Sequence, residues 1–318
     1  MHRSGTSALA GALANLGLSF FEPNDEVKGS VANPKGFFER SSLIQLNDSL
    51  LATHDWSWDS LDLNFFEVEK ATEFITQAQS YISNLKDDAP LGVKDPRSCV
   101  LMPFWRRALL DRLELMVITR DPAEVAWSLQ VRDGLPVEVG LALYIAYSTH
   151  LAQGIQGLLP HFVRYENLVN SPTTELTLIA QFLHNSDVPV LHQQSDIDVA
   201  AKSIDSNLRR ETFPRWVDEH PLTIEARSIR ELLHQASSTD ISITPSHLCH
   251  EILEYQFTVK KLLDVNNQLH QAREEVKLTK FQFEQKCLQL IQTETSFSLR
   301  LGLFLTWPIR KLRPSNQR

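Results

Sequence analysis

The chain has 318 residues, of which 42% are hydrophobic and 22% charged, a balance that excludes wholesale disorder. A formal charge of −8 argues against a protein that coats nucleic acid, so no nucleic-acid partner is expected. Three cysteines are too few for a disulfide framework or a cysteine zinc site, which fits a reduced, cytoplasmic location.

Residues 2–16 combine a short polar loop with an apolar helical pattern. The loop consists of Arg3, Ser4, Gly5, Thr6 and Ser7. Small residues at a helix start let backbone N–H groups converge on an anion, and arginine and hydroxyl side chains add donors. An ordinary helix cap uses the same residue types. A secretion signal is a third interpretation, which Asn15, Gly17 and the lack of a small-residue cleavage site disfavour.

Three short apolar segments are predicted strands, at residues 91–94, 115–119 and 161–165. Each is followed by a polar turn and a helical pattern. Such alternation is typical of an α/β domain in which helices cover both faces of a parallel sheet. This domain is predicted to span residues 1–245 and to end at Pro245.

The second of these strands leads into a further candidate anion site. Arg120 follows the strand directly, where ligands bind in open α/β sheets. Pro122 is placed where a helix should begin, and Ser128 falls two turns into that helix. The pattern predicts that Arg120 and Ser128 share an anion. A capped surface helix with a solvated arginine is the simpler alternative.

Residues 246–295 carry a heptad pattern, which predicts a coiled coil and self-association into a homo-oligomer. The d positions are Leu248, Tyr255, Leu262, Leu269, Val276, Phe283 and Leu290, and the a positions are Ile252, Val259, Asn266, Arg273, Lys280 and Cys287. A single amphipathic helix folded back on the domain is the alternative.

Residues 296–318 contain no acidic residue and mix cations with leucine, phenylalanine and tryptophan. This composition predicts an amphipathic basic tail that makes peripheral contact with the inner face of the membrane. Docking on the chain's own body, or a frayed tail, would explain the same residues.

The loop of residues 3–6 together with the Arg-x-Pro-x-x-Val-x-x-Ser pattern of residues 120–128 resembles the sulfotransferases that use 3′-phosphoadenosine 5′-phosphosulfate (PAPS). The bacterial members associated with polysaccharide or glycan modification are the most similar. The resemblance extends through 34–39, 46–48, 94–97, 132–136 and 165–168, and so covers most of residues 1–215. It implies a P-loop-like fold and transfer of a sulfuryl group to a hydroxyl of a carbohydrate or glycolipid acceptor.

The resemblance also implies roles for single residues. Arg3, Ser4, Gly5, Thr6 and Ser7 would hold the 5′-phosphosulfate of PAPS, Arg120 and Ser128 its 3′-phosphate, and Tyr165 would lie near the adenine. Many cytosolic relatives have a lysine where this chain has Arg3. Arginine stabilises a leaving phosphate but cannot donate a mobile proton, so the acid for the leaving group stays unassigned.

The acceptor hydroxyl needs a positioned base, and Glu39 is the candidate. Its phenylalanine neighbours would form an apolar wall that raises its pKa. A surface ion pair with Arg40 or Lys35 is the alternative. Asp95 is a second base candidate in the segment 94–97, where Lys94 and Arg97 could touch the sulfate, and Arg209 and Arg210 are weaker candidates for the 3′-phosphate. The histidine spacings indicate no metal site.

A phosphate loop of this kind needs a preceding strand to fix its position, and here that strand would fall before Met1. We therefore expect residues upstream of Met1 in the native protein.

Two other functions fit parts of the pattern. One is a P-loop kinase-like phosphoryltransferase, against which the missing lysine–serine pair and acidic magnesium ligands count. The other is a coiled-coil scaffold whose sulfotransferase-like domain is inactive.

Overall fold

The computed structural model describes residues 1–20, 25, 36, 38–84, 90–110, 113–204, 212–235 and 241–311. This description does not include the side chains of residues 270, 287, 288 and 290, nor the side chains of residues 291–311. Helices dominate the described residues, and a small parallel sheet of two strands accompanies them.

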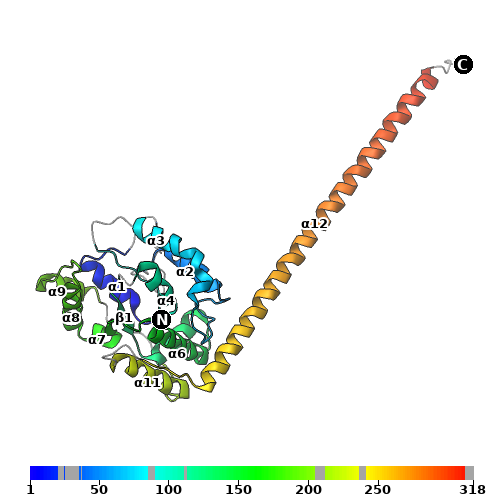
Figure 1. Ribbon diagram of the computed structural model, residues 1–318. Coiled ribbons are helices and arrows are strands. Elements are labelled where there is room, and N and C mark those ends of the chain that lie inside the picture. The colour runs from blue at the N-terminus through cyan, green and yellow to red at the C-terminus, as the bar shows by residue number, and fades with distance from the viewer. Residues whose placement is uncertain are drawn as a thin grey trace. The chain divides into compact units, whose positions relative to one another are not determined.

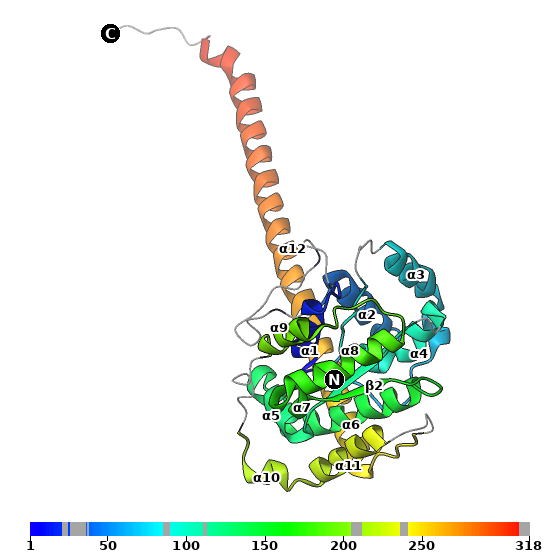
Figure 2. The same cartoon turned by 90° about the vertical axis from the view of Figure 1, so that its left-hand side faces the viewer.

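The elements follow one another in the order shown in Figures 1 and 2. They are α1 (Thr6–Asn15), α2 (Ser41–Ala52), the 3-10 helix η1 (Val68–Phe74), α3 (Ile75–Asn84), α4 (Ser98–Leu109), β1 (Met116–Thr119), α5 (Pro122–Asp133), α6 (Val137–Gly154), β2 (His161–Arg164), α7 (Tyr165–Asn170), α8 (Pro172–Asn185), α9 (Gln194–Lys202), α10 (Arg215–Asp218), α11 (Pro221–Gln235) and α12 (His247–Lys311).

Strands β1 and β2 confirm two of the three predicted strands. They pair in parallel, from Met116 opposite His161 to Thr119 opposite Arg164. Parallel neighbours need a long crossover connection, which α5 and α6 provide. Both strands therefore end at the same edge of the sheet, and the residues that follow them lie close together there.

The side chains of β1 alternate between two layers of helices. Ile118 packs with residues of α1, α8 and α9 on one face, together with Val163 of β2. Val117 packs against Met102 of α4 and Leu151 of α6 on the other face. This period-two alternation is the pattern expected for a buried strand covered on both sides.

The predicted strand at residues 91–94 is wrong in the described structure. Leu91 makes a single parallel bridge with Ser19, and the residues after it are not strand. Val93 is 45% exposed, whereas the charged side chain of Lys94 is buried in an ion pair with Glu39. A strand buried on both faces would instead bury the valine and expose the lysine. The two-stranded sheet is correspondingly smaller than the sheet expected from sequence.

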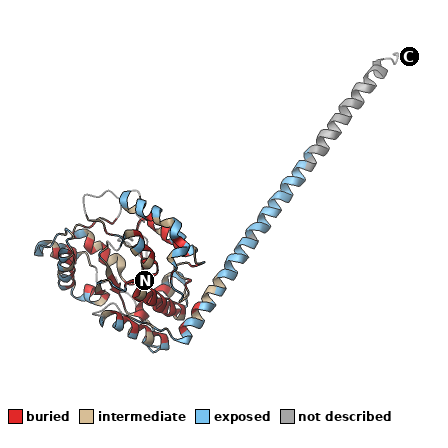
Figure 3. Cartoon of the chain, viewed as in Figure 1, coloured by how far each residue is buried: buried red, intermediate tan, exposed pale blue. Residues whose placement is uncertain are grey.

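Helix α6 forms the centre of the largest core cluster. All of its residues except Glu138 and Gln153 are buried, and the helix is mostly red in Figure 3. It packs against α4, α5 and α11. A helix that is apolar on all sides is stable only where other elements cover every face.

Helix α12 runs across the predicted boundary at residue 295, and its first residues belong to the compact unit that precedes it in sequence. It begins at His247, two residues after Pro245, but Cys249 and Leu253 are buried in the core of the compact unit Met1–Thr258. That unit therefore extends beyond residue 245. The helix also continues past residue 295 to Lys311, so no helix end separates the heptad segment from the tail.

None of the helices in the described ranges is long and apolar enough to cross a membrane.

Because Leu141 of α6 is fully buried, Leu141→Ala removes packed atoms and leaves a cavity. We expect the free energy of unfolding to fall by about 2–5 kcal/mol. Leu159, which is 80% exposed, provides the matched control, and Leu159→Ala should stay within about 0.5 kcal/mol of the wild type. Urea denaturation monitored by circular dichroism measures both, and equal losses would contradict the central place of α6.

Candidate functional site

The polar loop Arg3–Ser7, called the anion loop below, enters α1 through left-handed backbone. Arg3 has a φ of 65° and Gly5, the N-cap residue of α1, a φ of 92°. In the described structure no side chain caps this helix start, and its first turn has no acidic residue. Its backbone N–H groups and the positive end of the helix dipole are therefore suited to an anion. Ser4 is buried, whereas Thr6 and Ser7 are half-buried.

Position 5 accepts glycine alone because Tyr165 lies directly against it. A Cβ built on Gly5 would come within 2.2 Å of Tyr165 Cδ2. Tyr165 is itself buried at the junction of β2 and α7. The close approach of ring and backbone thus ties the anion loop to the carboxyl end of the sheet.

The two sequence motifs meet in the folded chain. Arg3 Nε donates to Ser128 Oγ at 2.7 Å, and Arg120 Nη1 donates to the Arg3 carbonyl at 3.3 Å. These contacts join segments more than a hundred residues apart in sequence. Arg3, Arg120, Ser128 and Tyr165, each predicted separately, therefore belong to one cluster.

Arg120 is buried, with only 4% of its surface exposed, so it is not the solvated arginine of the simpler alternative. Its Nε is paired with Glu124 Oε2 at 2.7 Å, and its guanidinium lies 4.8 Å from the centre of the Tyr165 ring. Its Nη2 is buried without a hydrogen-bond partner in the described structure. An unsatisfied guanidinium nitrogen is costly to bury, so an anion bound there would be stabilised.

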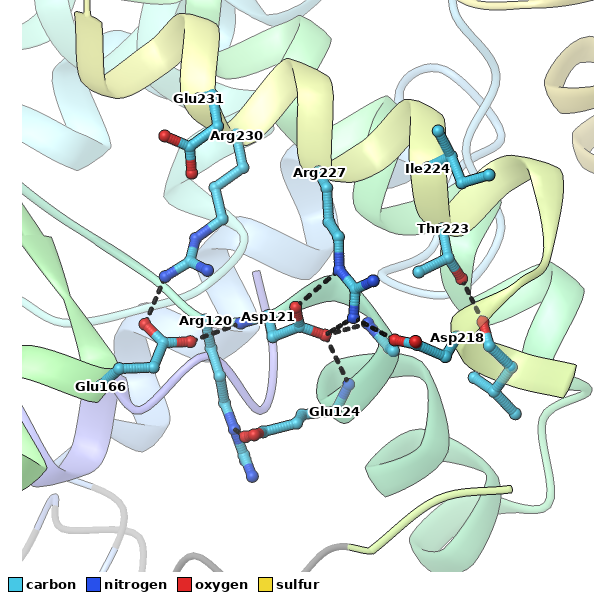
Figure 4. Close-up of polar contacts among 12 residues, drawn as sticks. Arg120, Asp121, Glu124, Glu166, Asp218, Thr223, Ile224, Arg227, Arg230 and Glu231 are labelled. Carbon is cyan, nitrogen blue, oxygen red and sulfur yellow. Dashed lines mark hydrogen bonds and ion pairs between the residues drawn. The ribbon is translucent and has the colours of Figure 1, made fainter. Parts of the chain in front are cut away.

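The turn after β1 is held by ion pairs from α11, drawn in Figure 4. Asp121 caps α5 by accepting from the backbone N–H of Ala123 and Glu124, and its backbone N–H donates to Glu166 at 2.9 Å. Arg227 is paired with Asp121 at 2.8 Å, and Arg230 is paired with Glu166. These charges fix the turn that carries Arg120.

A cavity of about 410 Å³ lies beside this turn, at the carboxyl ends of β1 and β2. It is lined by Asp121, Glu124, Arg164, Glu166, Phe213, Arg227 and Arg230. Ligands bind at this edge in open α/β folds. No local sequence pattern connects the α11 arginines with this turn, because they follow β1 by about a hundred residues. Only Glu124 has a sequence signal, its i, i+4 spacing from Arg120.

Glu39 is buried and paired with Lys94 rather than with a neighbour on the surface. Lys94 Nζ also donates to Ser7 Oγ at 3.3 Å, which connects Glu39 to the first turn of α1. Burial raises the pKa of Glu39, although Lys94 opposes the shift. The raised pKa agrees in direction with the predicted role as a base.

Asp95 is held in a buried hydrogen-bond network. Its Oδ2 accepts from Asn47 Nδ2 at 2.8 Å, and its Oδ1 accepts from the backbone N–H of Arg97 at 2.9 Å and from Arg97 Nη1 at 3.0 Å. Trp105 Nε1 completes the network by donating to Asn47 at 3.0 Å. Both carboxylate oxygens are thus engaged by the protein, which suits a structural anchor better than a base.

Two further expectations from the sequence concern the remaining candidate residues. Arg209 and Arg210 lie outside the described residues. Across the part of the chain that the structure describes, no group of three or more histidine, cysteine, aspartate or glutamate side chains is arranged to hold a metal ion.

No protein-family model matches the chain, and no curated protein matches it significantly.

The contact between Gly5 and Tyr165 gives a direct test of the loop geometry. Gly134 also has a positive φ, of 72°, but nothing lies within 4 Å of a Cβ built there. We expect Gly134→Ala to cost about 1–2 kcal/mol of stability from backbone strain alone. Gly5→Ala should cost a further 1–3 kcal/mol, roughly, because the new methyl group overlaps a buried ring.

Thermal unfolding of both variants measures the difference. Similar losses for Gly5→Ala and Gly134→Ala would mean that the Tyr165 ring moves aside without cost, and the described packing of the loop would be wrong.

Proposed function

We propose that the chain is a sulfotransferase that transfers the sulfuryl group of PAPS to a hydroxyl of a carbohydrate or glycolipid. The observation that carries this proposal is the convergence of its two motifs, through the 2.7 Å contact from Arg3 to Ser128 and the 3.3 Å contact from Arg120 to the Arg3 carbonyl. In this proposal the anion loop holds the 5′-phosphosulfate, while Arg120 and Ser128 hold the 3′-phosphate.

The electrostatics of the cluster support a doubly anionic ligand. Arg120 has one nitrogen engaged by Glu124 and another buried without a partner in the described structure. The uncapped start of α1 offers backbone donors a short distance along the same cluster. Donors fixed in advance around a developing negative charge contribute about 3–4 kcal/mol each to transition-state stabilisation.

Glu39 is the proposed base for the acceptor hydroxyl. Burial raises the pKa of Glu39 and so makes it a stronger base, whereas Asp95 is engaged on both oxygens. Sulfuryl transfer then forms an oxygen–sulfur bond to the acceptor as the bond to the donor phosphate breaks, much as in phosphoryl transfer.

The proposal also includes a P-loop-like fold for the domain and a coiled coil formed by α12. The β1–α5–α6–β2 unit, with ligand-binding groups at its carboxyl edge, supports a P-loop-like domain. Along the described part of α12, six predicted d residues are exposed, with Leu262 at 64% and Val276 at 68%; the others are Leu248, Tyr255, Leu269 and Phe283. We propose that a second copy of the chain covers this column in a coiled coil.

Membrane contact and a cytoplasmic location stay proposals. Membrane contact rests on the basic, apolar composition of residues 296–318, whose side chains lie outside the described residues. The cytoplasmic location rests on the small number of cysteines.

Binding of the product 3′-phosphoadenosine 5′-phosphate (PAP), measured by isothermal titration calorimetry, tests the assignment of Arg120. We expect Arg120→Met to weaken PAP binding by about 10- to 100-fold, the worth of one charge-assisted contact. Because this variant leaves Glu124 buried without its partner, Arg120→Met/Glu124→Gln is measured beside it and should lose the same affinity.

Arg107→Met is the matched control, since Arg107 lies on α4, is paired with Glu69 on the surface and does not line the cavity. Its PAP affinity should stay within about threefold of the wild type. The wild type should also transfer radiolabelled sulfate from PAPS to a member of a glycan panel. Transfer of phosphate from ATP instead, or equal PAP affinity in all variants, would contradict the proposed function.

A further inference from the structure

The Lys94 side chain contacts two parts of the site that are distant from each other in sequence, Glu39 and the first turn of α1. Its Nζ is paired with Glu39 and also donates to Ser7 Oγ at 3.3 Å, in the first turn of α1. The Lys94 and Glu39 side chains are only 9% and 10% exposed. The Lys94 amine therefore lies between the start of α1, which is suited to binding a phosphate, and the Glu39 carboxylate, the proposed base for the acceptor hydroxyl.

This position matters because the anion loop has no residue that can give up a proton to a leaving phosphate. Arg3 is charged at any accessible pH, and arginine does not deprotonate in proteins. Thr6 and Ser7 are alcohols and poor acids. A lysine ammonium combines positive charge with a transferable proton, and Lys94 reaches the first turn of α1 from the neighbouring segment.

The surroundings of the pair make proton exchange between its members easier. In water a glutamate and a lysine differ in pKa by about six units. Burial raises the pKa of Glu39 and lowers the pKa of Lys94, and each shift persists although the opposite charge counteracts it. The two pKa values therefore move toward one another, which lowers the cost of passing a proton from one group to the other.

We propose that Glu39 and Lys94 form a proton relay from the acceptor hydroxyl to the leaving phosphate; this inference rests on the proposed function. The acceptor oxygen bonds to sulfur and its proton passes to the Glu39 carboxylate. The bond between sulfur and the donor phosphate oxygen breaks, and that oxygen takes a proton from Lys94. Glu39 then returns the acceptor's proton to the Lys94 amine, so both groups recover their initial states.

The nearby charged residues are less suited to this role. Arg97 is engaged by Asp95 at 3.0 Å and by Asp48 at 2.7 Å, and as an arginine it cannot release a proton. Asp95 accepts on both oxygens from Asn47 and Arg97. Among the described contacts, it is Lys94 that connects Glu39 to the anion loop.

Two substitutions of Lys94 separate its charge from its proton. Lys94→Arg keeps the positive charge but removes the mobile proton, whereas Lys94→Met removes both. We expect Lys94→Arg to bind PAP within about threefold of the wild type and Lys94→Met about tenfold or more weakly. In both variants turnover of PAPS, with a glycan or water as acceptor, should fall by about 10²–10⁴.

A double-variant cycle tests whether the two groups act as one unit. Glu39→Gln should lower turnover by a similar factor, and Lys94→Arg/Glu39→Gln should be no slower than either single variant. Independent roles would multiply the two losses. The alkaline limb of the pH–rate profile should also disappear in Lys94→Arg, because arginine does not titrate there.

Lys70→Met is the matched control, since Lys70 also pairs with a glutamate, Glu67, at 2.7 Å, but both side chains are exposed. It should retain full turnover and PAP affinity. Full turnover by Lys94→Arg, or multiplicative losses in the cycle, with PAP binding intact, would overturn the relay alone. A wild-type chain that neither binds PAP nor turns over PAPS would overturn the proposed function and the relay with it.

Discussion

The burial of the Arg120 guanidinium is the constraint around which the site is organised. A cation that is 4% exposed must be neutralised and hydrogen-bonded locally, because water cannot compensate it. Glu124 supplies the neutralising negative charge, and the Arg3 carbonyl accepts a hydrogen bond from the guanidinium. The Tyr165 ring packs against the guanidinium. Each of these partners comes from a different part of the chain, so satisfying one charge brings α5, the anion loop and the end of β2 together.

Buried charges of two kinds lie in the segments that contact or neighbour the anion loop. The Asp95–Arg97 network is closed, since Asn47 and Arg97 engage both oxygens of Asp95 and Asp48 engages Arg97. Such a network of mutually hydrogen-bonded groups stabilises one conformation. The pair of Glu39 and Lys94 differs because Lys94 also reaches a hydroxyl of the anion loop, and burial shifts the pKa of both groups. Buried charge serves structure in the first case and is suited to chemistry in the second.

Helix α11 extends this organisation to the opposite side of the β1–α5 turn. Arg227 and Arg230 lie one turn apart on α11 and engage Asp121 and Glu166, which follow the two strands. Ion pairs at a surface contribute little, but Arg230 is 8% exposed and also donates to Thr119 at the end of β1. The sheet edge is therefore fixed from two directions, by the anion loop and by α11.

Local patterns in the sequence determined α1 after its glycine loop, strands β1 and β2, and the start of α5 at Pro122. These features depend on residues only a few positions apart, so short-range patterns are sufficient to predict them. The tertiary structure alone decided that residues 91–94 do not form a strand, that Lys94 joins Glu39 to Ser7, and that α11 holds the turn after β1. Those outcomes depend on which distant segments pack together, because a buried charge takes whichever partner the packing brings within reach.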